Sequence, residues 1–288
     1  INPTGGMDLF SMEMANLLTG NAPGEAIIEM HFPAPVLLFQ STALIALSGA
    51  DFTATLNNHP IPIHQPIWVK EQDVLAFRSP AKGARLYLSV AGGFAFDQWL
   101  GSGSTNLVAA AGGFRGRALA NGDEIQLQKK WKGIPEGKTV LPWKAGPDWG
   151  DESDQIGILS GNEWDWLTDA SKELFFSQAY QLSTQSDRMG YRLEHPSLAL
   201  TRQQELVSSA VNRGTLQLLP NGKIILLMAD HQTTGGYPRL GHVASAHHHR
   251  LAQYRPGDPI YFRRVSQSTA EQWMTRQQQH LLQLRNAC

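Results

Sequence analysis

The chain of 288 residues has a single cysteine, no long apolar run and almost no net charge. Because the cysteine is the last residue, Cys288, an internal disulfide is impossible, and we expect a reducing compartment, the cytoplasm. A catalytic thiol at a frayed chain end would be hard to position, so we expect Cys288 to be incidental. No apolar stretch approaches the roughly 20 residues that cross a bilayer, and the first residues lack the pattern of a signal peptide. We therefore expect no membrane span and no secretory leader.

The lack of charge of one sign excludes two classes of partner. Lys and Arg number 24 against 25 Asp and Glu, which gives a net charge of −1. Such a chain has no field that would steer it onto a phosphate backbone or an anionic bilayer, so we expect no nucleic acid and no membrane as partners. The apolar share of 42% and the charged share of 17% are those of an ordinary folded protein, and the length favours two domains.

Two sequence signatures of cofactor and nucleotide chemistry are also missing. No Met-Lys-Met biotin-acceptor sequence occurs, so we expect this chain to carry no biotin of its own. No Walker-type phosphate loop or ATP-grasp pattern can be recognised either. A reaction driven by ATP would therefore need a site in another subunit, or a site of an unfamiliar kind.

Most of the sequence consists of short apolar segments bounded by turn residues, which predict strands. Val36–Phe39, Ala43–Leu47 and Arg85–Ala91 are examples. Two hairpins are predicted as well. Thr53–Leu56 and Ile61–Ile63 flank an Asn-Asn pair, and both asparagines tolerate positive φ. A stronger signal is the Asn-Gly turn at 220–223, between the apolar runs 215–219 and 224–228.

Three segments predict helices. Asp8 caps a short helix that ends at Gly20. Asn162–Phe176 is expected to be helical in one or two short pieces. The chain closes with a longer helix, in which Ser268 and Glu271 have the spacing of a capping box.

A Gly-Asp turn precedes an alternating stretch twice, in residues 121–127 and again in residues 256–262. Two such strands far apart in the chain suit two β-barrel-like halves, although Gly-Asp turns are also common elsewhere. We predict a mainly-β fold, a β-rich α+β class, with a few short helices and a C-terminal helix. The N-terminal half would span 1–130 and the C-terminal half 155–288, joined by a linker or crossing at 131–154 that is rich in Pro, Gly, Lys and Asp.

Glycines and hydroxyl residues gather in three neighbouring stretches, Ala91–Phe94, Leu100–Asn106 and Gly112–Arg117. Glycines at this density allow backbone amides to approach a ligand closely, and Ser and Thr add hydroxyl donors. The alternative is a set of tight turns at barrel corners. A phosphate loop is excluded, because no Gly-Lys-Ser or Gly-Lys-Thr sequence closes the pattern.

A second polar segment, Gln185–Leu193, places an acid, a hydroxyl and two arginines around a glycine. The guanidinium groups of Arg188 and Arg192 suit a bidentate clamp on a carboxylate or phosphate, and Asp187 can accept from an amide N–H. Ser186 adds the hydroxyl. The alternative is a surface loop in which Asp187 pairs with an arginine and contributes little to stability.

A third polar segment, Met228–Pro238, follows a strand that is expected to be buried. Asp230 stands where the strand ends, and loops that follow strands of a rigid scaffold often carry functional sites. We favour function here, because few turns need so many different hydrogen-bonding groups. The candidate residues beyond Asp230 are Gln232, Thr233, Thr234, Gly235, Gly236 and Tyr237.

Histidines follow this segment. His247, His248 and His249 are neighbours, and three consecutive side chains are poorly placed to bind one metal, so we expect solvated loop residues and no metal site. His242 is a better-placed acid–base candidate, with a structural role as the alternative.

Three of these stretches resemble the hallmark strings of one family, that of biotin-dependent carboxyltransferases and allophanate hydrolase subunit 2, which includes the C-type subunits of 5-oxoprolinase. The long matches are residues 185–193, 228–238 and 112–119. The shorter matches are residues 6–8, 15–18, 47–51 and 251–258. The resemblance runs from near residue 5 to near residue 265.

The resemblance implies cyclophilin-like barrel folding and an enzyme that is active only in a complex, with partner subunits of the 5-oxoprolinase A and B types. It implies the ATP-dependent opening of the 5-oxoproline lactam to glutamate, with an ATP site that is unknown and that partner subunits can supply. In that reaction Asp187 and Asp230 would be acid–base or amide-binding groups. Arg188 and Arg192 would hold a carboxylate or phosphate, and the 232–237 loop would cradle the reacting carbonyl or a phosphorylated intermediate.

Two departures from the family pattern keep other functions open. A stretch with Gln-Asp-X-Gly-Arg that usually precedes the 6–8 match is absent from this sequence. Gly103 and Asn106 stand where the family usually has Arg and Asp. One alternative is carboxyl transfer from biotin on a partner chain to urea or another small amide. The other is a regulatory binding protein, since some family members antagonise an inhibitor of a sporulation histidine kinase.

Overall fold

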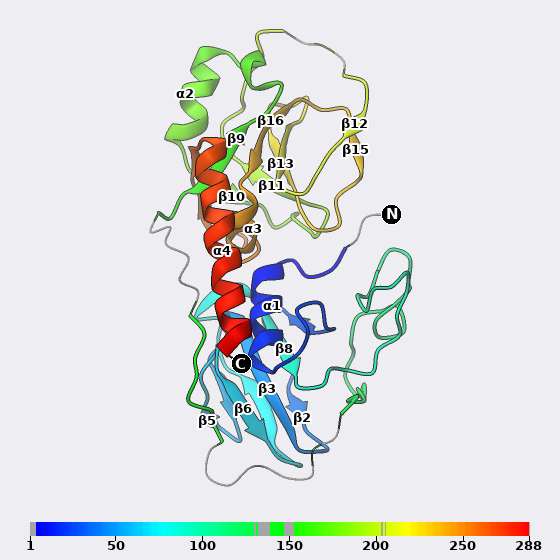
Figure 1. Cartoon of the computed structure of the whole chain (residues 1–288). Helices are drawn as coiled ribbons and strands as arrows, with labels where there is room; N and C mark the ends of the chain where they lie inside the picture. Colours follow the sequence, from blue (N-terminus) through cyan, green and yellow to red (C-terminus); the bar gives the residue numbers. More distant parts are fainter. Residues whose placement is uncertain are drawn as a thin grey trace. The chain divides into compact units, whose positions relative to one another are not determined.

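The computed structural model describes residues 4–129, 131, 139–146, 153–202, 204 and 206–287. The chain divides into two compact units (Figure 1). One, here called the barrel unit, comprises Ile1–Met7 and Trp149–Gln277. The other, the two-sheet unit, comprises Asp8–Asp148 and Gln278–Cys288. Most of the predicted linker lies outside the described residues, as does Cys288. The mainly-β class, with few helices and a C-terminal helix, is confirmed.

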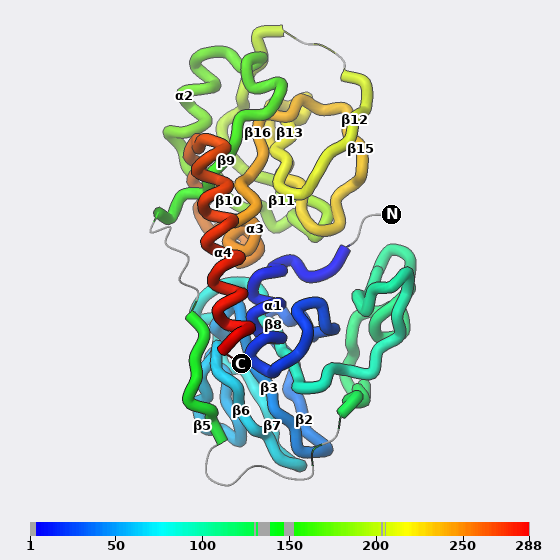
Figure 2. Tube along the Cα trace, viewed as in Figure 1, coloured from blue at the N-terminus to red at the C-terminus, as the bar shows by residue number. Residues whose placement is uncertain are grey.

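The barrel unit is built on one eight-stranded sheet in the order β17-β10-β11-β14-β13-β16-β9-β18. The two end strands are separated in sequence only by Tyr261, so the sheet curls round until it is nearly closed. The strands are β9 (Ile156–Ser160), β10 (Tyr180–Leu182), β11 (Gly190–Glu194), β13 (Thr215–Leu218), β14 (Ile224–Leu227), β16 (Arg239–Val243), β17 (Pro259–Ile260) and β18 (Phe262–Arg264). A separate two-stranded ladder joins β12 (Ser209–Ala210) to β15 (Thr234–Gly235), and Figure 2 shows it beside the barrel sheet.

Alternation along the strands decides what fills the barrel. On β13, Leu216 and Leu218 belong to the hydrophobic core, so Gln217 between them faces the outside of the barrel. The predicted 215–228 hairpin is confirmed: Leu218 pairs with Ile224, and Gly222 adopts φ +76° in the turn. At one end of the core, Phe175 packs edge-on against Trp164 and stacks on Phe262.

The helices of the barrel unit confirm one expectation and correct another. The 162–176 segment forms two pieces as predicted, the 3-10 helix η1 (Trp164–Trp166) and α2 (Asp169–Ser177). The three neighbouring histidines, however, are not solvated loop residues. They lie in η2 (Ser245–His247) and α3 (His248–Leu251), where the apolar surroundings of the core bury the rings of His247 and His249.

The C-terminal helix α4 (Gln267–Ala287) is confirmed, but its cap is not the predicted one. The Ser266 hydroxyl accepts the N–H of Thr269 at 3.1 Å, so the helix begins two residues earlier than the Ser268 and Glu271 pattern suggested. The ring of Trp273 stacks on His247 with 4.4 Å between centroids and anchors the first part of α4 to the barrel unit. No helix of the described residues has the length and apolar composition of a membrane span.

The two-sheet unit holds one sheet in the order β1-β8-β3-β6 and another in the order β2-β7-β4-β5. Its strands are β1 (Ile28–Met30), β2 (Leu37–Leu38), β3 (Ala43–Asp51), β4 (Ala54–Leu56), β5 (His59–Pro60), β6 (Pro66–Val69), β7 (Val74–Phe77) and β8 (Lys82–Val90). Helix α1 (Leu9–Leu18) is capped by Asp8, whose carboxylate accepts the Ser11 N–H at 2.8 Å, and Gly20 follows its end at φ +72°. Both features were predicted.

Two strand predictions in this unit need correction. The Asn-Asn hairpin forms, with φ of +50° and +68° at Asn57 and Asn58, but its second strand is His59–Pro60 and not Ile61–Ile63, because a two-residue turn leaves no room for a longer loop. The first Gly-Asp turn is not followed by a β-strand. Residues 124–127 make only an isolated β-bridge, between Leu127 and Phe94. The second Gly-Asp turn does lead into β17.

Candidate functional site

Strand pairing brings the second and third polar segments together. Gly190 on β11 pairs with Leu227 on β14, and beyond the ladder the Met228 N–H donates to the Met189 carbonyl at 3.0 Å. The Asp230 N–H then donates to the Arg188 carbonyl at 2.8 Å. Residues predicted to act together from segments about 40 positions apart therefore meet at one end of two adjacent strands.

At this junction Arg188 and Asp230 form a bidentate ion pair. The Arg188 Nε lies 2.7 Å from Asp230 Oδ2, and Nη2 lies 3.2 Å from Oδ1. The same guanidinium also donates to the carbonyl of Gly5, which ties the first residues of the chain to the barrel unit. Both side chains remain 20–30% exposed, at 28% for Arg188 and 21% for Asp230. The carboxylate that Arg188 holds in this structure is therefore that of Asp230.

Asp187 and Ser186 shape the turn that leads into β11. Asp187 Oδ1 accepts the N–H groups of Met189 and Gly190 at 2.8 and 3.1 Å, and Ser186 Oγ accepts the Arg192 N–H at 3.0 Å. Asp187 does not pair with an arginine in the described residues. The side chain of Arg192 is exposed on the outer face of β11, and no ion pair joins it to another described residue. Of the two arginines, Arg192 is thus the one that is open to a ligand anion.

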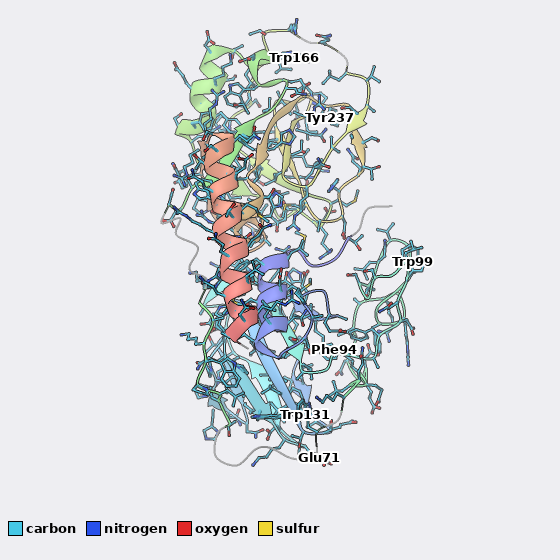
Figure 3. All side chains as sticks on the ribbon, viewed as in Figure 1. Glu71, Phe94, Trp99, Trp131, Trp166 and Tyr237 are labelled. Carbon is cyan, nitrogen blue, oxygen red and sulfur yellow. The ribbon has the colours of Figure 1, made fainter. Side chains whose placement is uncertain are left out.

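The loop after Asp230 folds back over the outer face of the barrel. Its Thr234–Gly235 segment forms β15 and pairs with β12, and the Val211 N–H donates to the Thr233 carbonyl at 3.1 Å. Gln232, Thr233 and Thr234 are exposed, whereas Gly235 is buried. The ring of Tyr237 is 41% exposed, and Figure 3 labels it on the side of the barrel unit that carries β12 and β15. We call β12 and β15, with the residues from 206 to 211 and 232 to 236 that flank them, the flap.

Gln217 and Thr215 lie on the outer face of β13, with the flap above Gln217. A methyl group built on Gly235 would lie only 2.6 Å from the Gln217 Nε2, so glycine is what allows the flap to approach this closely. Thr215 Oγ1 lies 3.1 Å from His242 Nδ1 on the neighbouring strand. Burial, and then the positive charge of Arg239, lower the pKa of His242, which keeps its ring neutral at neutral pH.

A second ion pair fixes one strand of the flap to the barrel. Arg239 donates to the Glu163 carboxylate twice, from Nε to Oε2 at 2.9 Å and from Nη2 to Oε1 at 2.8 Å. Its Nη1 donates to the Ser209 hydroxyl on β12 at 3.1 Å. These hydrogen bonds from Arg239 lower the pKa of the Glu163 carboxyl. Because Ser209 pairs with Gly235, this chain of contacts sets the position of the flap over Gln217.

Replacing Glu163 with Gln tests this anchor. We expect the free energy of unfolding at pH 7 to fall by about 3 kcal/mol, because Arg239 loses its charged partner while it stays largely buried. Amide hydrogen exchange should also speed up at residues 209–211 and 233–235. Urea titration and exchange mass spectrometry measure the two effects. Glu194→Gln, on an exposed position of β11, is the matched control and should change neither; equal exchange in both variants would contradict the anchor.

Some residues of this region escaped the sequence analysis. Gln217, Glu163 and Arg239 were not candidates. A lone polar residue in an alternating strand, such as Gln217, is expected to be exposed to solvent. Only the return of the 230–237 loop across the barrel surface buries Gln217. No local sequence signal predicts that return.

The first polar segment of the sequence, at 91–117, does not join this site, because it lies in the two-sheet unit. Among the described residues, no group of three His, Cys, Asp or Glu side chains is arranged to hold a metal ion.

Comparisons with known proteins agree on one family. The model of the "carboxyltransferase domain, subdomain A and B" family matches residues 1–264. The chain is 34% identical to the C-type subunit of 5-oxoprolinase from Escherichia coli over 284 residues, which is 99% of this chain and 89% of that protein. It is 28% identical to urea amidolyase of Saccharomyces cerevisiae over 280 residues, but spans only 15% of that protein.

Among solved structures, urea carboxylase of Kluyveromyces lactis superposes with a TM-score of 0.87 at 27% identity. The match covers 99% of this chain and 27% of that one. Urea amidolyase of the same yeast gives a TM-score of 0.86, with 18% of its length covered. The fold seen here is thus the one that these much larger proteins contain as one part.

Proposed function

The chain belongs to the family of carboxyltransferase domains with subdomains A and B, and from that premise we propose that it acts as the C-type subunit of an ATP-dependent 5-oxoprolinase. In this role it opens the lactam of 5-oxo-L-proline to L-glutamate together with A-type and B-type partner subunits. The cytoplasm is the compartment that this proposal assumes.

One observation carries the proposal. The identity of 34% to the C-type 5-oxoprolinase subunit of Escherichia coli extends over 99% of this chain and 89% of that protein, and the matching protein of Haemophilus influenzae is 33% identical over 286 residues. The yeast urea amidolyase is less similar, at 28%, and this chain spans only a small share of it. Similarity to a protein of comparable length supports a subunit role more strongly than similarity to one part of a larger enzyme.

The proposed reaction breaks the C–N bond of the lactam. Water adds its oxygen to the lactam carbonyl carbon, the ring nitrogen leaves and is protonated, and glutamate results. A second water cleaves ATP to ADP and phosphate, which drives the opening, and we place the ATP site in the partner subunits. Asp230 and Asp187 would orient the amide or move its proton, Arg192 would bind the substrate carboxylate, and the flap amides would polarise the carbonyl.

The experiment that tests this function is 5-oxoproline-dependent ADP release by this chain, reconstituted with its A-type and B-type partners. We expect release only when all chains, ATP and 5-oxoproline are present, with glutamate formed in equal amount. Omitting each chain in turn is the control. If no ADP is released in the full mixture, also with the family's usual N-terminal stretch added, then the proposed function is wrong.

A second candidate is carboxyl transfer from biotin on a partner chain to urea or a related amide. The superposition on urea carboxylase over 99% of this chain, with a TM-score of 0.87, favours it. Avidin distinguishes the two functions, since it should block carboxyl transfer and leave 5-oxoproline hydrolysis unaffected.

A further inference from the structure

Gln217 is a buried side chain whose polar atoms make no hydrogen bond within the described structure. Its exposed fraction is 0%, yet neither Nε2 nor Oε1 has a hydrogen-bond partner among the described residues. An unpaired buried amide costs free energy that native proteins usually avoid, since the great majority of buried polar groups are paired. An apolar Leu or Met at position 217 would avoid this cost in free energy. We therefore infer that the polar side chain of Gln217 serves a purpose other than folding.

The position of Gln217 in the sheet is also irregular. Leu216 pairs with Gly241 on β16, but Gln217 pairs with Arg239, so Leu240 is an extra residue between the two pairs. Such bulges re-aim neighbouring side chains and are frequent beside functional sites. The carboxamide of Gln217 lies directly under Gly235 of the flap, with Gln232 Nε2 also close to that position.

The cover over Gln217 is thin. β12 and β15 have two residues each, and Val207, Ser208, Ala210, Thr233 and Thr234 are all exposed to solvent. A two-stranded ladder that packs on only one side belongs to the least stable parts of a fold and opens locally. Opening of the flap would uncover the Gln217 carboxamide without disturbing the barrel core on the other side of β13.

We propose that Gln217 is the substrate-recognition residue of this site, and that its carboxamide pairs with the cis-amide edge of a small lactam or urea once the flap opens. A primary carboxamide presents its C=O and one N–H side by side. A five-membered lactam does the same, because its ring forces the amide to be cis, and urea shares that edge. Two parallel hydrogen bonds then join the two groups, N–H to O in each direction.

This geometry selects a class of substrate. An ordinary trans peptide presents its N–H and C=O on opposite edges and forms only one of the two hydrogen bonds. The inference rests on the proposed function and adds to it the residue that recognises the lactam. The names of two relatives of this chain, a 5-oxoprolinase subunit and urea amidolyase, denote a lactam and urea, and both of these molecules present such an edge.

The test replaces Gln217 with Met in the reconstituted complex. We expect the KM for 5-oxoproline to rise about 100-fold with little change in kcat, since two hydrogen bonds of about tenfold each are lost. The unfolding temperature should stay the same or rise, because an apolar chain of similar length replaces two unpaired polar atoms. Gln181→Met, at an exposed position of β10, is the matched control and should leave KM and unfolding temperature unchanged.

Substrate analogues give a second readout. N-methyl-5-oxoproline lacks the N–H that donates to the Gln217 Oε1, so one of the two hydrogen bonds is lost. The wild-type complex should therefore prefer 5-oxoproline by about tenfold, and Gln217→Met should remove most of that preference. An unchanged KM in Gln217→Met would overturn the proposal. A fall in its unfolding temperature would do so as well, because it would show that Gln217 is a structural residue.

If the wild-type complex releases no ADP, the proposed function is wrong. The recognition role of Gln217 can still be tested, by measuring whether the protein binds the small amides. Calorimetric titration of 5-oxoproline and of urea into the wild-type protein and into Gln217→Met then gives the answer. Binding that is lost in the variant supports the recognition role. Binding that is equal in both proteins, or absent from the wild type, overturns it.

Discussion

Asp230→Asn is expected to lower 5-oxoproline-dependent ADP release about 100-fold or more while the protein stays folded. In the proposed function Asp230 orients the amide or moves its proton, and removing a group in that role typically costs two to four orders of magnitude. Asn has the same size and still accepts one hydrogen bond from Arg188. The ion pair is partly exposed, so its loss should reduce the free energy of unfolding by only about 1 kcal/mol.

A matched pair in the same unit provides the control. Arg255 and Asp258 are joined by a contact of 3.3 Å between Nε and Oδ2, and Asp258 is 29% exposed, close to the value for Asp230. Asp258→Asn should therefore change stability by a similar amount and leave turnover intact. Wild-type turnover in a folded Asp230→Asn complex would remove Asp230 from the reaction and leave it as the anchor of Arg188 alone.

The second large effect is a steep loss of stability of the barrel unit in mild acid. Burial lowers the pKa of His195 to about 4 and the pKa values of His248 and His249 to about 3. In the unfolded chain each ring titrates near about 6.5. Between these values the unfolded chain binds protons that the folded chain does not, so stability is complete above the unfolded pKa and falls as the pH drops below it.

The magnitude follows from the three rings together. Each contributes a loss of about 1.4 kcal/mol per pH unit below 6.5, so the three remove about 4 kcal/mol per unit. Since a typical domain has only about 5–15 kcal/mol in total, we expect the barrel unit to unfold near pH 5. Calorimetric unfolding at pH 7, 6, 5.5 and 5 measures the decline, and an unfolding temperature that does not change over this range would contradict it.

A single substitution shows whether these rings are responsible. In His195→Gln, the side-chain carbonyl can take over from Nε2 as the acceptor for the Ile224 N–H, which lies at 3.0 Å, while the titrating group is removed. The decline in stability per pH unit should become about one third smaller. His59→Gln, at an exposed position of the two-sheet unit, is the control and should leave the decline as it is in the wild type.

The candidate site shows where sequence reasoning succeeds and where it stops. Asp230 became a candidate because it follows an apolar strand and begins a run of polar residues, which is a local signal, and the strand before it is confirmed as β14. Its partner was not predicted. The sequence suggested that Arg188 holds an anion of a ligand, but its guanidinium holds Asp230, because the pairing of β11 with β14 brings position 188 beside position 230. Pairing between distant strands has no local sequence signature.

Burial of polar groups was the other limit. His247 and His249 were expected in solvent, yet their exposed fractions are 1% and 6%. They are buried because the rings stand beneath the first turns of α4, where Trp273 stacks on His247 and Gln277 lies 3.2 Å from His249 Nδ1. Gln217 is similar, since it is covered by a loop that returns from residue 230 onward. The sequence around a polar residue does not show whether a distant segment will bury it.

By itself, the sequence determined the mainly-β class, the hairpin at 215–228 and the capped helix after Asp8, because alternation, turn residues and caps act over a few neighbouring positions. The family was indicated by the resemblance of whole residue strings, such as 185–193 and 228–238. Tertiary structure alone decided that residues 4–7 group with the barrel unit, that Arg188 pairs with Asp230, and that Gly235 closes over Gln217. These depend on contacts between residues 18 to 183 positions apart, which form only when the whole sheet has closed and the loops have settled on its outer face.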